Sequence, residues 1–104
     1  MNTEFSYLYL TCDESQKEQI AKLLLEAKLI ACAKFVPVDS MYWWKGTIER
    51  ASEALIIMEA PTANFAAIEA EVAKIHSYDT FVLTQVLMTN INHDAKQWIK
   101  GSTV

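Results

Sequence analysis

Segments with the composition of β-strands carry apolar side chains at both odd and even positions, and this feature constrains the fold more than any other. The residues concerned are Trp43, Trp44, Ala54 to Met58, Phe81, Val82, Leu83, Val86, Leu87 and Met88. Successive side chains of a strand point to opposite faces, so these strands are apolar on both faces. An antiparallel sheet with one face in water alternates apolar and polar residues instead. The sequence therefore predicts a sheet that is covered on both sides.

Apolar periodicity and turn residues divide the chain into seven elements. Lys45-Gly46 predicts a two-residue hairpin turn, because such turns favour glycine. Pro37 predicts a bend or bulge, because proline cannot donate to a strand ladder. The expected elements are a strand at 5–11, a helix at 13–28, extended chain at 31–36 and 41–44, a strand at 47–59, a helix from 61 to 76, a strand at 81–91 and a short helix at 92–100.

This order predicts an α+β fold of the ferredoxin-like type: a split βαβ arrangement (βαββαβ) with one antiparallel sheet, followed by a short C-terminal helix. Right-handed crossovers place both long helices on the same face of the sheet. The other face would expose an apolar patch of a size that soluble monomers avoid. Its cover is either another copy of the chain or the terminal helix around Trp98. A helix of about 8 residues is only about 12 Å long, which favours self-association.

Length and charge set further bounds. The 104 residues are expected to form a single domain, 1–104, with a formal net charge of −4. The acidic balance argues against nucleic acid and anionic membranes as partners. Residues 1–4 have no basic region before an apolar stretch, so no signal peptide is expected. No segment is long and apolar enough to span a bilayer, and two cysteines without a C-x-x-C spacing indicate a cytoplasmic protein with free thiols.

Several motifs resemble those of the CutA family, the divalent-cation tolerance proteins. Met41–Glu49 is similar to the family's Y-W-W-x-G-x-I-E hairpin, and Lys28–Ala33 to its K-L-A-A-C segment. Leu10–Glu14 resembles its T-C-P-D-E motif without the proline, and His76–Asp79 resembles H-P-Y-E. The resemblance spans nearly the whole chain. It implies a ferredoxin-like subunit in a homotrimer, in which hairpins of neighbouring subunits complete intersubunit sheets.

The same resemblance implies a role in tolerance or binding of copper or another divalent cation, and an architecture shared with the trimeric PII-type signalling proteins. The ligand sites would then be clefts between subunits. Two alternatives stay open at this point: a structural or interaction trimer without a metal role, and an enzyme with a site built across subunits.

The chain departs from the family pattern next to the H-P-Y-E motif. Ser77 replaces the first proline, and Phe81 and Val82 stand where the family has a proline and a glutamate. A glutamate can ligate a metal ion and valine cannot. The departures therefore weaken a metal role at this place.

The candidate metal ligands are Cys12 and His76. Cys12 is expected where a strand meets a helix start, and helix N-termini stabilise thiolates. His76 is expected at a helix C-terminus, where a protonated imidazole is favourable without any metal. Cys32 is expected to be a buried small side chain, and His93 opens the terminal helix.

Aromatic residues form the second group of candidates, for ligand binding or for an interface between subunits. They are Tyr42, Trp43, Trp44, Tyr78 and Trp98. No nucleophile–base pair is visible, so no catalytic residue is assigned and no enzyme is expected. Glu49, Glu53 and Glu59 are expected to form a solvated edge.

Overall fold

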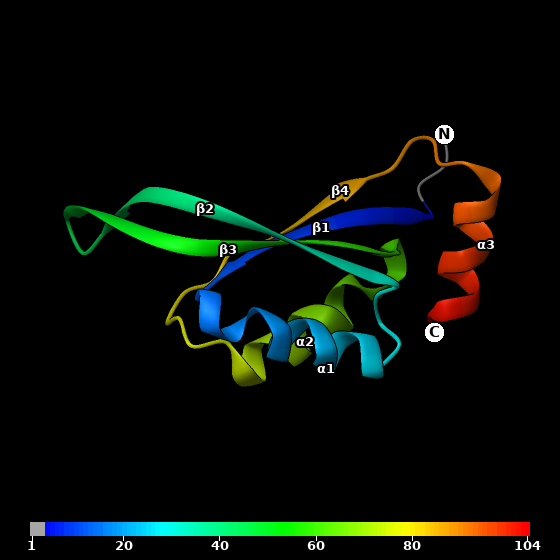
Figure 1. The fold of residues 1–104 in the computed structure, drawn as a ribbon, viewed down its shortest axis with the longest axis horizontal. Coiled ribbons are helices and arrows are strands. Elements are labelled where there is room, and N and C mark those ends of the chain that lie inside the picture. The colour runs from blue at the N-terminus through cyan, green and yellow to red at the C-terminus, as the bar shows by residue number, and fades with distance from the viewer. Residues whose placement is uncertain (1–3) are drawn as a thin grey trace.

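A four-stranded antiparallel sheet with the order β2-β3-β1-β4 forms the centre of the computed structural model (Figure 1). The structure describes residues 4–104, so the expectation of no signal peptide, which concerns residues 1–4, falls mostly outside the described residues. The elements are β1 Phe5–Cys12, α1 Lys17–Glu26, β2 Cys32–Trp44, β3 Thr47–Pro61, α2 Phe65–Ile75, β4 Leu83–Leu87 and α3 His93–Ser102, with short 3₁₀ turns at Glu14–Gln16 and Thr62–Asn64. The order of strands and helices confirms the predicted α+β, ferredoxin-like fold.

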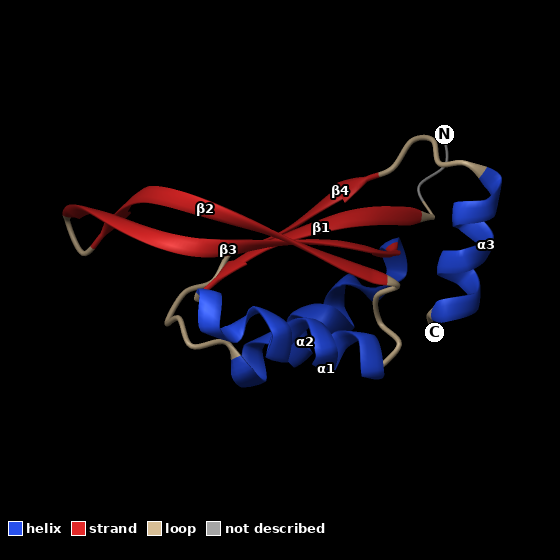
Figure 2. Cartoon of the chain, viewed as in Figure 1, coloured by secondary structure: helices blue, strands red, loops and turns tan. Residues whose placement is uncertain are grey.

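Helices α1 and α2 cover one face of the sheet (Figure 2). Their buried side chains meet the even-numbered residues of β1 and β3. The largest members of this core are Leu8, Leu10, Ile20, Leu24, Ile56, Met58, Ile68 and Val72. Each of these side chains stabilises the fold by roughly 1.5–3 kcal/mol through removal of apolar surface from water.

The β2–β3 hairpin is longer and more regular than the sequence predicts. The register runs without a break from Cys32 opposite Glu59 to Trp44 opposite Thr47. The expected bend or bulge at Pro37 is therefore wrong. Pro37 is tolerated because β2 is an edge strand, where a residue without an N–H group costs no sheet hydrogen bond on the open side.

Strand β4 is shorter than the predicted strand at 81–91, since only Leu83–Leu87 belong to the sheet. Its partner β1 begins at Phe5, and Ser6 opposite Leu87 is the last pair. Beyond that pair, the Met88 N–H donates to the Phe5 carbonyl at 2.9 Å, and Phe5 is the first residue of β1. On the other side, Phe81 belongs to the loop that follows α2.

The second face of the sheet is covered at one end only. Helix α3 packs there through Ile99, which is buried together with Phe5 and Met88. Further along the same face, Tyr7 and Tyr9 remain 37% exposed. The terminal helix is therefore an incomplete cover, and the projecting half of the hairpin has no cover from helices at all (Figure 1).

Candidate functional site

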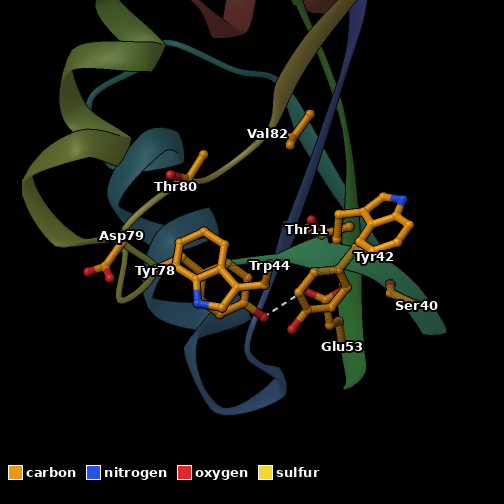
Figure 3. Close-up of a pocket in the computed structure, with 10 residues that line it drawn as sticks. Thr11, Ser40, Tyr42, Trp44, Glu53, Tyr78, Asp79, Thr80 and Val82 are labelled. Carbon is orange, nitrogen blue, oxygen red and sulfur yellow. Dashed lines mark hydrogen bonds between the residues drawn. The ribbon is translucent and has the colours of Figure 1, made fainter. Parts of the chain in front are cut away.

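A pocket of about 480 Å³ lies where the hairpin meets the loop between α2 and β4 (Figure 3). The volume is within the range of roughly 300–1,000 Å³ that is typical of small-molecule sites. The lining residues are Thr11, Ser40, Tyr42, Trp43, Trp44, Glu53, Tyr78, Asp79, Thr80 and Val82. They come from β1, β2, β3 and the α2–β4 loop, so the fold unites segments that are far apart in the sequence.

Hydrogen bonds from His76 attach the α2–β4 loop to the sheet. The Nε2 atom lies 2.9 Å from the carbonyl oxygen of Thr11, and Nδ1 accepts a hydrogen bond of 3.1 Å from the Tyr78 backbone N–H. A carbonyl can only accept, so the Nε2 atom is the protonated one. Gln16 adds a further link, since its Oε1 accepts the Ser77 N–H at 3.1 Å. The loop that forms one wall of the pocket is therefore held by specific bonds.

Phe81 contributes to the same attachment. Its ring stacks on the His76 imidazole with 5.0 Å between centroids and 19° between planes. Tyr78 meets the imidazole from another side, in an edge contact with centroids 4.7 Å apart. The residue that departs from the CutA pattern at position 81 thus packs against the histidine that was a candidate metal ligand.

Glu53 is a buried carboxylate among the lining residues of the pocket. Its side chain accepts a hydrogen bond of 2.6 Å from the Tyr78 hydroxyl, and the residue is only 8% exposed. Burial, together with this bond and the negative charge of Glu53, raises the pKa of Tyr78. The Tyr78–Glu53 pair joins the loop to β3.

The prediction of a solvated edge is wrong for Glu53 and Glu59. Strand β3 is a central strand, so its side chains are more enclosed than those of an edge strand. Glu59 forms an ion pair with Lys34 across the hairpin. In the sequence, the one sign that Glu53 could be enclosed is that it precedes Leu55 by two residues and so shares a face of β3 with it. Its burial also depends on Tyr78, which is 25 residues away in the chain.

Four of the five aromatic candidates lie together. Tyr42, Trp43, Trp44 and Tyr78 all line the pocket. Trp98 does not, because it lies on α3 at the opposite end of the sheet from the hairpin (Figure 1). It is 46% exposed.

A comparison with protein families shows which family has this fold and these motifs. Residues 6–102 match the family described as CutA1 divalent ion tolerance protein. The chain belongs to the CutA1 family. The resemblance to the CutA family is thereby confirmed.

Individual CutA relatives agree with this assignment. The chain is 41% identical over 76 residues to the divalent-cation tolerance protein CutA of Archaeoglobus fulgidus, across 72% of this chain and 74% of that protein. A solved structure of the Archaeoglobus fulgidus protein, which is named a periplasmic divalent cation tolerance protein, has a TM-score of 0.92 at 33% identity, across 94% of this chain and 97% of the other. The structure of CutA1 from Oryza sativa has a TM-score of 0.93 at 26% identity, across 98% and 95% of the two chains.

The name of the family implies a metal-binding site, and Cys12 is the first candidate ligand for one. This thiol is fully buried. Burial, with smaller effects of Asp13, Glu14 and Glu53 that outweigh Lys17, raises its pKa from 9.0 to about 11. The expectation of a reactive thiolate at a helix start is therefore wrong, because the thiol points into the core and acidic side chains surround the helix start. A protonated thiol is a poor ligand, since metals bind the thiolate.

His76 has no free ring nitrogen to bind a metal ion either. Both ring nitrogens are already in hydrogen bonds to Thr11 and Tyr78. Val82, at the place of the family's glutamate, is 63% exposed and has no ligating atom. Across residues 4–104, no group of three or more His, Cys, Asp or Glu side chains could hold a metal ion. The metal role of Cys12 and His76 stays a prediction, and their present arrangement does not fit one.

Within the described part of the chain, no helix is both long and apolar enough to cross a membrane.

Proposed function

We propose that this CutA1-family protein assembles as a homotrimer and binds a small molecule in the pocket beside the hairpin, as its contribution to divalent-cation tolerance. The observation that supports assembly best is the incompletely covered face of the sheet. The pocket residues supply aromatic surfaces and carboxylates. The Tyr78 hydroxyl beside Glu53 has a raised pKa and is therefore not activated as a nucleophile, which favours binding over catalysis.

Apolar side chains on this face are exposed in a continuous group over neighbouring strands. Tyr7 of β1 is paired with Val86 of β4, Tyr9 of β1 with Ile57 of β3, and Val36 of β2 with Leu55 of β3. Val36 is 38% exposed and Val86 is 40% exposed. Soluble proteins rarely leave such a patch in water, so another copy of the chain is the favoured cover.

The hairpin supplies a second surface for contact between copies. Its outer half carries Met41, Trp43 and Ile48, which are 66%, 72% and 58% exposed. A hairpin that docks on a different patch of the next copy can repeat around a closed ring, and the family resemblance favours a ring of three.

Direct ligation of copper by Cys12 and His76 is left out of this proposal. The thiol is buried and protonated at neutral pH, and both imidazole nitrogens have other partners. A tolerance protein can act by binding another molecule, for example as a PII-type signalling protein does. A cytoplasmic location is proposed from the two free cysteines, Cys12 and Cys32.

Two matched variants test the assembly. Val36→Glu introduces a charge on the open face of the sheet, and Leu25→Glu introduces one on the outer side of α1, at a leucine that is 41% exposed. We expect light scattering to show that Val36→Glu lowers the particle mass toward that of one chain, since a buried unpaired charge is costly. Leu25→Glu should keep the wild-type mass. Equal masses for both variants and the wild type would contradict assembly through the open face.

A further inference from the structure

We infer that the pocket beside the hairpin selects small organic cations with a substituted ammonium group. This inference rests on the proposed function for the role of the pocket as a ligand site. It adds the chemical class of the ligand, and it follows from the kinds of side chain that surround the pocket.

Four of the ten lining residues of the pocket are aromatic. Tyr42, Trp44 and Tyr78 come from two different segments and lie around one space (Figure 3), and Trp43 also lines this space. The faces of tyrosine and tryptophan rings carry partial negative charge and attract cations, tryptophan most strongly. The Trp44 ring already has such a neighbour, because the Lys45 ammonium lies 5.7 Å from its centroid.

The charged residues of the pocket are both acidic. Glu53 and Asp79 line it, and none of the ten lining residues is Lys, Arg or His. Among residues 4–104, the Glu53 carboxylate accepts one hydrogen bond, from the Tyr78 hydroxyl to Oε1, so negative charge remains for a ligand to compensate. Figure 3 shows the Asp79 side chain directed away from Trp44, so Glu53, which accepts the Tyr78 hydroxyl, is the carboxylate in contact with an aromatic side chain of the pocket.

These features disfavour other ligand classes. An anion would be repelled by the Glu53 carboxylate, and no Lys, Arg or His is among the lining residues to attract it. A neutral ligand would bury the Glu53 charge further without compensating it. A bare divalent cation needs several oxygen ligands, and no cluster of three or more potential ligand side chains exists among the residues that the structure describes. An organic cation satisfies both the aromatic walls and the carboxylate.

Choline and its uncharged analogue, 3,3-dimethyl-1-butanol, test this inference directly. The two molecules have nearly the same shape and differ in the quaternary nitrogen. We expect choline to change the tryptophan fluorescence of the wild-type protein and to bind about tenfold or more tightly than the neutral analogue. Calorimetric titration of the same sample measures both affinities, and a native mass of that sample reports the assembly.

Two variants locate the binding. Glu53→Gln keeps an acceptor for the Tyr78 hydroxyl and removes the charge, so choline binding should weaken about tenfold toward that of the neutral analogue. Glu49→Gln removes a carboxylate from the same strand outside the pocket lining, and it should leave the choline affinity unchanged.

Three results would overturn the inference: equal affinity for choline and the neutral analogue, no choline binding up to about 10 mM, or unchanged choline binding in Glu53→Gln. Any of these in a sample with the mass of a trimer leaves the proposed assembly intact. A sample with the mass of one chain contradicts the proposed assembly. The titration still decides the ligand class in that sample, because all ten lining residues belong to one chain.

Discussion

At the scale of single residues, the thiol of Cys12 shows how its surroundings determine chemistry. The side chain is part of the core between the sheet and the two helices, with Leu10 and Ala54 as other members of that core. A thiolate there would lose its hydration and would face Asp13 and Glu14. Cys12 therefore acts as a small apolar side chain whose proton is retained well above neutral pH.

This retained proton predicts a pH dependence of stability. The folded-state pKa of Cys12 is about 11 and its ordinary value is 9.0. Unfolded chains lose the proton above about pH 9, while folded chains keep it, so the contribution of Cys12 is complete below pH 9 and is lost as the pH rises toward 11. We expect the difference in unfolding free energy between wild type and Cys12→Ala to fall by about 2 kcal/mol over this range.

Urea unfolding at a fixed protein concentration, at several pH values from 7 to 11, measures this difference. Val72→Ala removes a buried side chain that does not titrate, and its difference from the wild type should stay constant with pH. If the difference in unfolding free energy between the wild type and Cys12→Ala also stays constant with pH, the result would contradict a thiol that is buried in its protonated form.

At the scale of elements, the end of α1 shows an imperfect match between sequence and geometry. The Lys28 N–H donates to the Leu25 carbonyl and the Leu29 N–H to the Leu24 carbonyl, each at 3.0 Å. These two bonds form the Schellman motif, in which the residue after the helix adopts a left-handed conformation. Lys28 has a φ of 59°, at a position where glycine is usual.

Lys28→Gly is therefore expected to stabilise the protein. Glycine adopts positive φ without the steric cost that a β-carbon imposes, so the unfolding free energy should rise by about 0.5–1 kcal/mol. The neighbouring Ala27 has a φ of −76°, and Ala27→Gly should lower the unfolding free energy because glycine gains flexibility in the unfolded chain. Denaturant unfolding of both variants decides this. A loss of stability in Lys28→Gly would contradict the geometry of the helix end.

Local patterns predict most of the elements, and pairing between distant segments explains the errors. The apolar stripes locate α1 and α2, and Lys45-Gly46 forms the turn with both φ angles positive, at 49° and 83°. The strand at 81–91 was predicted too long because its end depends on where β1 begins. The aromatic hairpin identifies most of the pocket, but Glu53 needs Tyr78 and the whole α2–β4 loop to become a buried carboxylate.

At the scale of the whole molecule, the single chain is elongated and incompletely covered. Its principal extents are 45, 27 and 22 Å, and the longest of these reflects the hairpin that projects beyond the helices (Figure 1). Both edge strands, β2 and β4, have no partner strand on their outer sides within residues 4–104. Unpaired edges and an apolar face together favour association with other copies of the chain.

The mass of the unmodified protein under native conditions tests this account most directly. Native mass spectrometry at micromolar concentration should show particles of three chains, each of 11.8 kDa. An 11.8 kDa species that stays monomeric, and whose open face binds no dye specific for apolar surfaces, would contradict the account.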